Sequence, residues 1–189
     1  MTDLWVPKHL KYFEETTNEV ARDWLRKAYN YAWINSDDPD TKTGAAIVKS
    51  DFCTLGTNRL PFGLEKTPER LQCPGKYNSL EHAERDAIYS ATRLGDSHKY
   101  LADGIMYMPW LPCIPCVHAM MGVNLKQLVS HEAMVTRYIE KVNSSGNDKW
   151  KDEIDEALGQ LLEVGIQLVM YKGDIGGVKA LYDGEEWEP

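Results

Sequence analysis

The chain has 189 residues, of which 43% are hydrophobic and 26% charged, a balance typical of one folded domain rather than of a disordered or fibrous protein. Its formal net charge of −8 disfavours a broad nucleic-acid surface, because such surfaces neutralise phosphates with Lys and Arg. The sequence has neither an apolar run of roughly 20 residues nor a signal-peptide layout, so we expect a cytoplasmic protein without membrane contacts.

The first segment, residues 1–15, is predicted to be an N-terminal extension, because it shows no sustained hydrophobic period. A capping-box spacing from Thr16 to Glu19 then predicts the start of a helix. This helix should end before Pro39, since proline disfavours helical geometry in the residue that precedes it. Its buried stripe is expected to contain residues that recur at helical spacing, namely Val20, Trp24, Ala28, Tyr31 and Ala32.

Two short strands are predicted next, at residues 44–48 and 52–57, with a tight polar turn between them. Residues 58–77 are rich in Pro, Gly and charge, and we expect a loop there. Asn78 or Ser79 should then cap a second helix that runs to Gly95.

The second half alternates strands and helices, which predicts a sheet with parallel later strands and helices on both faces. The expected strands are 104–108, 125–130 and 165–171, the expected helices are 113–121 and 150–164, and the polar stretch 142–149 is expected to be a loop. Residues 183–189 should form a loose acidic tail. The predicted fold is therefore a three-layer α/β/α domain over residues 16–182.

Two short motifs carry the chemistry of the predicted site. His82 lies two residues before Glu84, and Cys113 and Cys116 form a Cys-x-x-Cys pair after Pro112. Zinc favours imidazole and thiolate ligands, and a catalytic zinc site has three protein ligands and one position for water. His82, Cys113 and Cys116 supply that set, and both motifs fall at predicted helix starts, where the helix dipole stabilises thiolates.

A bound zinc ion lowers the pKa of its water from about 15.7 towards roughly 7. Glu84 is close enough to take a proton from that water and return it to a leaving amine, which predicts hydrolytic deamination. Alone, the Cys-x-x-Cys pair could equally be a redox pair or half of a structural zinc site, and His-Ala-Glu could be ordinary helix content. Together, in the order H-x-E and P-C-x-x-C, they match the signature of zinc base deaminases.

At these residues the chain resembles the cytidine deaminase superfamily, and within it the deoxycytidylate (dCMP) deaminase branch. The resemblance also covers residues 38–48, residues 56–63, which match G-x-N-x-x-P-x-G, and residues 163–168. It implies a five-stranded mixed sheet, in agreement with the predicted elements. It further implies that Asn58 binds the sugar or base edge, that the Ala83 carbonyl accepts from the exocyclic amine, and that Trp110 lines the pocket.

The chain departs from the family pattern at three positions. Arg59 stands where relatives have Gly after the Asn, Asp86 replaces a usual Asn, and Pro109 replaces a usual Thr. The first departure lies in a region linked to nucleotide effectors, so control by dCTP and dTTP is not expected. Four basic residues of the predicted loop at residues 58–77 are candidates for binding phosphate: Arg59, Lys66, Arg70 and Lys76. Arg59 is preferred because it adjoins Asn58.

The predicted function is zinc-dependent conversion of dCMP to dUMP with release of ammonia, with a small pyrimidine nucleotide as ligand and Zn²⁺ as cofactor. One alternative is deamination of another cytosine nucleotide, nucleoside, base or nucleic acid, the last disfavoured by the acidic charge. An alternative from another class is a non-catalytic, zinc-stabilised module that binds nucleotides. The resemblance also implies a homo-oligomer.

Overall fold

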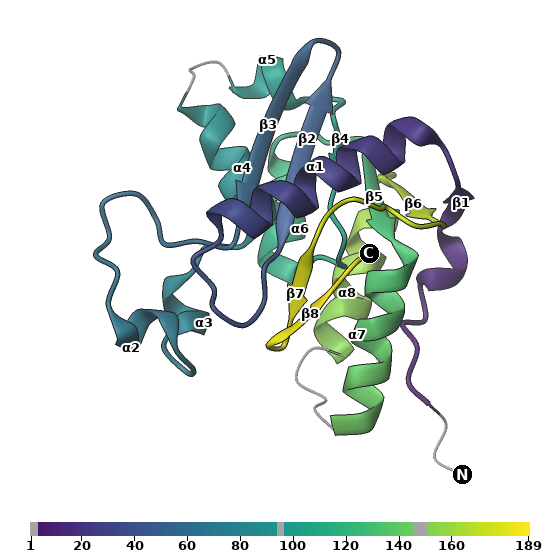
Figure 1. Cartoon of the computed structure of the whole chain (residues 1–189). Coiled ribbons are helices and arrows are strands. Elements are labelled where there is room, and N and C mark those ends of the chain that lie inside the picture. Colours follow the sequence, from purple (N-terminus) through teal and green to yellow (C-terminus); the bar gives the residue numbers. More distant parts are fainter. Residues whose placement is uncertain (1–3, 94–96, 146–150) are drawn as a thin grey trace.

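A six-stranded mixed sheet forms the centre of the computed structural model, which describes residues 4–93, 97–145 and 151–189 (Figure 1). The strands lie in the order β1-β6-β5-β4-β2-β3. Strand β2 runs antiparallel to β3 and β4, whereas β4, β5, β6 and β1 are parallel to one another, as the sequence predicted for the later strands. The strands span Glu14–Thr16 (β1), Gly44–Lys49 (β2), Phe52–Thr57 (β3), Ile105–Tyr107 (β4), Gln127–His131 (β5) and Gln167–Tyr171 (β6).

Helices cover both faces of this sheet, so the predicted three-layer α/β/α class is confirmed (Figure 1). Helix α1 packs on one face, and α4, α6 and α8 pack on the other. The helices span Glu19–Asn35 (α1), Pro68–Leu71 (α2), Lys76–Ser79 (α3), Ala83–Thr92 (α4), Ser97–Leu101 (α5), Ile114–Gly122 (α6), Glu132–Ser145 (α7) and Lys151–Glu163 (α8), and Leu10–Tyr12 forms a short 3-10 helix. No helix in the described part of the chain is both long and apolar enough to cross a membrane.

The predicted number of five strands was one too low. The sixth strand, β1, pairs in parallel with β6, with Glu14 opposite Val169 and Thr16 opposite Tyr171. It has three residues, two of them exposed glutamates, so it shows no apolar alternation that a sequence pattern could detect. The last residues of the predicted N-terminal extension therefore belong to the sheet.

Helix α1 forms where it was expected, but its cap and its buried face differ from the prediction. The cap is Asn18, whose Oδ1 accepts from the amide of Val20 at 2.7 Å, and Val20 itself is 57% exposed. The helix lies very close to β2: a Cβ on Gly44 would stand 2.0 Å from the Ala28 carbonyl oxygen. Small residues therefore face the sheet, and the buried stripe is Ala21, Leu25, Ala28, Tyr29 and Ala32.

Three further boundaries correct the sequence analysis. The second predicted helix divides into α3 and α4, because Arg59 and Glu81 form an antiparallel bridge that keeps the residues between the helices extended. Helix α7 continues through Ser145, so residues 142–145 are not a loop, and residues 146–150 lie outside the described residues. The expected loose acidic tail instead contains a strand, Glu185–Trp187 (β8), which pairs with Ala180–Tyr182 (β7).

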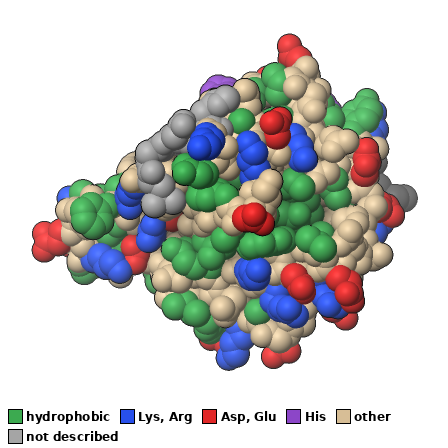
Figure 2. Space-filling model, turned by 90° about the horizontal axis from the view of Figure 1, so that it is seen from above, with side chains coloured by type: hydrophobic (Ala, Val, Ile, Leu, Met, Phe, Trp, Pro, Cys, Tyr) green, Lys and Arg blue, Asp and Glu red, His purple; other side chains and the backbone are tan. Residues whose placement is uncertain are grey.

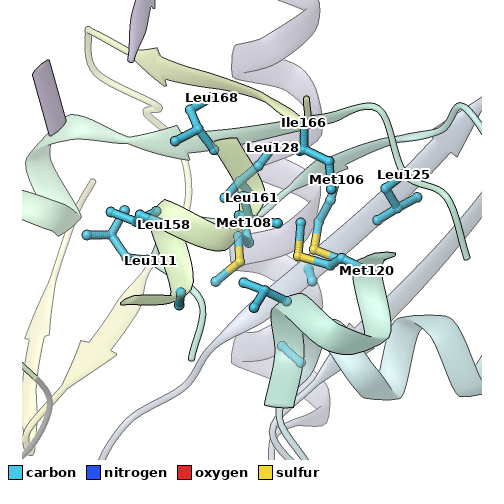
Figure 3. Packing of buried hydrophobic residues seen from close by; sticks show 14 of the residues in the cluster. Met106, Met108, Leu111, Met120, Leu125, Leu128, Leu158, Leu161, Ile166 and Leu168 are labelled. Atoms are coloured by element: carbon cyan, nitrogen blue, oxygen red, sulfur yellow. The ribbon is translucent and has the colours of Figure 1, made fainter. Parts of the chain in front are cut away.

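The larger hydrophobic core lies between the sheet and the α4, α6 and α8 layer. Figure 3 shows Leu158 and Leu161 of α8 near Met108, and Met120 of α6 beside Met106. All five side chains are buried in this cluster. Met108 also lines the cavity described below, so the core continues directly into the floor of the candidate site.

Candidate active site

His82 is held at the start of α4 by its neighbours in the chain. The bridge between Arg59 and Glu81, with backbone hydrogen bonds of 3.2 and 2.8 Å, fixes the segment that leads into the helix, and His82 is the N-cap residue. Helix α4 then lies directly on β3, where a Cβ on Gly56 would stand 2.2 Å from the Ala83 carbonyl oxygen. Glycine is required at this position because any side chain would displace the metal-site helix.

Cys113 and Cys116 come from the start of α6, with Cys113 as its N-cap residue. This segment connects the parallel strands β4 and β5, and it lies next to His82. Both motifs therefore lie at helix starts, as the sequence predicted. The His82 Nδ1 atom lies 3.3 Å from the Cys113 Sγ atom and 3.6 Å from the Cys116 Sγ atom, and the two sulfur atoms lie 3.4 Å apart. The three predicted ligands are thus brought together.

These distances fit a zinc ion. Tetrahedral bonds of about 2.3 Å to sulfur and about 2.0 Å to nitrogen place ligand atoms roughly 3.5–3.8 Å apart. The observed separations of 3.3 to 3.6 Å are close to that geometry, and the set offers three ligands, which leaves one position for water. Among the described residues the donor set therefore has the three ligands of a catalytic zinc site, not the four of a structural one.

In the metal-free chain the ligands share protons among themselves. A hydrogen bond from the Cys116 thiol lowers the pKa of Cys113 to about 4, against burial, and the hydrogen bond with His82 adds to that effect. The hydrogen bond to Cys113 in turn raises the pKa of His82 to about 9, although burial opposes it. Zinc therefore displaces protons from His82 and Cys116 when it binds.

Glu84 lies in the first turn of α4 and is 3% exposed. Burial raises its pKa, while the positive charge of His82 opposes the shift. A carboxyl group whose pKa is raised by burial holds a proton more readily than an exposed one, which suits a group that takes up and returns a proton. The residue therefore has the properties that the sequence analysis required of a proton carrier.

A cavity of about 390 Å³ opens onto His82, Glu84 and Cys113, and its volume lies within the range of small-molecule sites. Its floor is apolar and contains Met108, Leu111 and Ile154. Trp110 stands at its wall, where its ring meets Tyr182 edge-on at a centroid distance of 4.9 Å. Trp110 and Ala83 thus lie where the sequence analysis expected them, at the cavity.

Asn58 also lines the cavity, but its side-chain amide is engaged within the protein. Its Oδ1 atom accepts from the Ser36 hydroxyl at 2.6 Å and from the Thr43 amide at 3.0 Å. Its Nδ2 atom donates to the Thr41 carbonyl at 2.6 Å. The geometry therefore makes Asn58 the residue that shapes the 36–43 segment along the cavity wall.

Arg59, the preferred phosphate candidate, is not among the residues that line the cavity. Its Nε and Nη2 atoms both lie 2.9 Å from Asp86 Oδ1, and Asp86 Oδ2 accepts from the Thr57 amide at 3.0 Å. Arg59 and Asp86, which both depart from the family pattern, therefore form an ion pair with each other. This pair links the end of β3 to α4. Lys66 and Arg70 likewise do not line the cavity.

Lys76 is the loop base that does reach the cavity, and its side chain is 8% exposed. Its Nζ atom lies 2.9 Å from Asp38 Oδ1 and 3.0 Å from Asp40 Oδ2. Burial lowers the pKa of Lys76, but the hydrogen bonds to these two carboxylates outweigh it and the pKa is raised. Asp38 also accepts from the amides of Asp40 and Thr41, so the cluster is part of the local framework.

The sequence analysis missed the remaining wall, which helix α7 and the turn of the β7–β8 hairpin provide. Tyr138 and Lys141 line the cavity from α7, and Tyr182 and Asp183 line it from the hairpin. An apolar period of Met134, Val135, Tyr138 and Val142 in α7 carried the signal for this helix. The hairpin has three-residue strands, too short for a clear pattern.

The fold and this arrangement of ligand atoms define a zinc-dependent deaminase. Residues 18–132 match the family model for the cytidine and deoxycytidylate deaminase zinc-binding region, and the match covers more than half of the chain. The protein therefore belongs to the cytidine and deoxycytidylate deaminase family. None of the curated proteins matches the sequence significantly.

The structure is similar to that of the dCMP deaminase from the cyanophage S-TIM5. The apo form superposes with a TM-score of 0.56 at 16% sequence identity, over 83% of this chain and 100% of the other. The complex with dCMP and dUMP gives a TM-score of 0.60 at 16% identity, over 82% of this chain and 98% of the other. At this identity the likeness establishes the fold.

Proposed function

We propose that the protein hydrolyses dCMP to dUMP and ammonia, with His82, Cys113 and Cys116 as zinc ligands and Glu84 as the proton carrier. The observation that carries the proposal is a buried carboxylate beside a three-ligand metal site, open to a cavity of 390 Å³. A structural zinc site has no need of such a carboxylate, which argues against the non-catalytic alternative. The structural neighbour crystallised with dCMP and dUMP supports a pyrimidine nucleotide as the substrate.

The reaction exchanges the amino group on C4 of the base for an oxygen atom from water. Zinc, when bound, supplies Lewis acidity that makes water nucleophilic at neutral pH. Glu84 accepts a proton from the attacking water and delivers it to N3. It then takes the proton of the hydroxyl now on C4 and passes it to the amine, which leaves as ammonia as the C4–N bond breaks and the C4 carbonyl forms. Burial of Glu84 assists both directions of transfer, because it moves the pKa of the carboxyl towards neutrality.

The other predicted site residues have positioning roles in this proposal. The Ala83 carbonyl lies at the cavity and is available to the exocyclic amine of the base. Trp110, braced by Tyr138 and Tyr182, provides an aromatic surface beside the base. Asn58 acts through the 36–43 segment that it holds, because its own amide is occupied.

One observation favours a second candidate, a deoxycytidine deaminase. Each lysine among the described residues that line the cavity is paired with a carboxylate, Lys76 with Asp38 and Asp40, and Lys141 with Asp183. A site without an unpaired cation suits an uncharged nucleoside. The two candidates differ only in the 5′-phosphate.

A substrate panel tests the proposal. Zinc-loaded protein would be assayed for ammonia release from dCMP, CMP, dCTP, deoxycytidine, cytosine and a cytosine-containing oligonucleotide. We expect the highest kcat/KM for dCMP. A preference for deoxycytidine would establish the second candidate, and turnover of the oligonucleotide alone would contradict both.

The homo-oligomer stays a prediction, and light scattering at micromolar concentration would test it. The acidic net charge continues to disfavour a polynucleotide substrate. Figure 2 shows acidic and basic side chains interspersed over one face, with hydrophobic side chains between them. That face does not carry a continuous basic field of the kind that nucleic acid requires.

A further inference from the structure

Helix α7 presents one side to the cavity. Tyr138, Lys141, Val142 and Ser145 line it, and they are spaced three, four and seven residues from the first, as one face of a helix requires. The Tyr138 side chain is buried, and its hydroxyl has no hydrogen-bond partner among the described residues. Buried hydroxyls are almost always hydrogen-bonded, so the Tyr138 hydroxyl, on a residue that lines the cavity, is a candidate donor to a ligand there.

The two described lysines of the cavity differ in how firmly they are held. Lys76 is buried between two carboxylates, and Asp38 is in turn fixed by backbone amides, so the cluster has a net charge of −1 and repels an anion. The Lys141 side chain is 49% exposed and has one partner, Asp183, which is 53% exposed. Exposed pairs of this kind are weak and readily exchange partners.

We propose that Lys141 recognises the 5′-phosphate of the substrate, with the Tyr138 hydroxyl as a second donor and Asp183 as the partner that the phosphate displaces. This inference rests on the proposed function, because it names the residues that distinguish dCMP from deoxycytidine. A phosphate dianion carries more charge than a carboxylate, so it competes well for the same ammonium group.

Because of its position, Asp183 would compete with the phosphate of the substrate for the ammonium group of Lys141. Its backbone is fixed, since its amide donates to Thr41 Oγ1 at 3.1 Å and the Gly184 amide donates to the Asp40 carbonyl at 2.8 Å. Only the side chain can turn away when phosphate binds. A second hollow of about 260 Å³ adjoins the cavity at Lys141, Tyr182 and Asp183, and Arg137 lines it. Arg137 is already 4.0 Å from Glu185, and Glu140 and Glu185 also line this hollow, so the displaced carboxylate would turn towards solvent, to which it is 53% exposed.

The test compares a nucleotide with its nucleoside. Steady-state kinetics on dCMP and deoxycytidine would be measured for the wild type and Lys141→Gln. We expect KM for dCMP to rise about 10- to 100-fold, the range for loss of a charged hydrogen bond, and KM for deoxycytidine to stay within about twofold. Lys179→Gln is the matched control, because Lys179 is an exposed lysine paired with Glu186 outside the cavity.

Two further variants keep the test independent of folding. Asp183→Asn removes the competitor and should lower KM for dCMP about two- to fivefold, the opposite direction from Lys141→Gln. Tyr138→Phe keeps the ring contacts and should raise KM for dCMP about three- to tenfold. Calorimetric titration with dUMP and deoxyuridine should show the same differences in affinity.

The outcomes separate the two proposals. A wild-type preference for deoxycytidine over dCMP would overturn the proposed substrate, and this inference with it. A wild-type preference for dCMP that Lys141→Gln leaves unchanged would overturn the inference alone. Equal loss of activity on nucleotide and nucleoside in Lys141→Gln would also overturn it, because it would show a structural role for the lysine.

Discussion

The two sides of the cavity are built in different ways. The metal wall consists of His82, Glu84, Cys113 and Cys116, which lie at the starts of two helices. One helix is held by close packing against a glycine of β3, and the other by the parallel strands that flank it. The substrate wall comes from segments far apart in the sequence, and it includes Lys76, Tyr138, Lys141, Tyr182 and Asp183.

The two walls differ in how precisely they must position their side chains. The atoms of the metal wall must satisfy bond lengths to a few tenths of an ångström, so they are set on short, rigid turns. The substrate wall holds its lysines in two ion pairs: the buried one, at Lys76, is fixed by the local framework, and the exposed one, at Lys141, can exchange its partner without moving the backbone. In the proposed function, the reaction chemistry would thus depend on the first wall, and substrate choice on the exposed part of the second.

The largest effect should follow from removing a ligand in the metal wall. In Cys116→Ala we expect zinc content to fall well below one per chain and ammonia release to fall by at least about 10⁴-fold, because the metal supplies most of the acidity of the attacking water. Metal analysis and the deaminase assay measure both. Cys53→Ala, which changes an exposed cysteine, is the control. Full zinc retention in Cys116→Ala would contradict the ligand assignment.

A smaller effect is expected from Glu84→Gln, which preserves shape and removes the proton carrier. We expect kcat to fall about 10²- to 10⁴-fold, the usual contribution of general acid–base catalysis, while zinc content and KM stay near their wild-type values. Steady-state kinetics and metal analysis would show this. If KM rose and kcat were unchanged, Glu84 would belong to the substrate wall, and the division between the walls would not hold.

Lys76→Met breaks the substrate wall at its buried pair. We expect the free energy of unfolding to fall by about 3 kcal/mol, because Asp38 keeps its charge but loses its buried partner. Urea denaturation measures the change, and Lys66→Met is the matched control on an exposed lysine. Zinc content should not change. Loss of zinc in this variant would show that the two walls are coupled.

The smallest effect concerns His131, which ends β5 and is not among the residues that line the cavity. Its Nδ1 atom lies 2.9 Å from the Tyr29 hydroxyl and its Nε2 atom 3.0 Å from the Gly173 carbonyl oxygen. Burial lowers the pKa of His131, although the bond to Gly173 and the charges of Asp174 and Glu132 oppose the shift.

Because the neutral form is favoured in the fold, the unfolded chain binds the proton first as the pH falls below about 6.5. We expect the free energy of unfolding to drop between pH 7.5 and 5.5, by no more than the roughly 1.4 kcal/mol that protonation of one group with an unfolded pKa of about 6.5 allows over this range. The comparison is with His131→Gln, measured by denaturation at each pH. Equal pH dependence in the two proteins would assign the acid sensitivity to other groups.

The metal wall could be predicted from the sequence because its ligand spacing is local. His-x-Glu and Cys-x-x-Cys each supply their ligands within a few residues, and the alternation of strands and helices predicts the parallel strands that bring the two motifs together. The strand pattern at residues 44–57 was also predictable, since β2 and β3 form a regular hairpin.

The substrate wall could not be predicted in the same way, because tertiary contacts decide which charges face the cavity. Arg59 was preferred for its position beside Asn58, but Asp86, 27 residues later, draws its guanidinium away. Lys141 has no local motif, and its partner in the structure, Asp183, lies 42 residues further along the chain. Strand β1 and the β7–β8 hairpin are too short for hydrophobic periodicity to reveal.

The β7–β8 hairpin is the part of the cavity wall that is synthesised last. Its turn closes the cavity by bonding to residues 40–42, yet residues 180–187 leave the ribosome after every metal ligand has been synthesised. The metal ligands are therefore all synthesised before this part of the substrate wall, and the hairpin can join the cavity only once residues 180–187 have folded against residues 40–42.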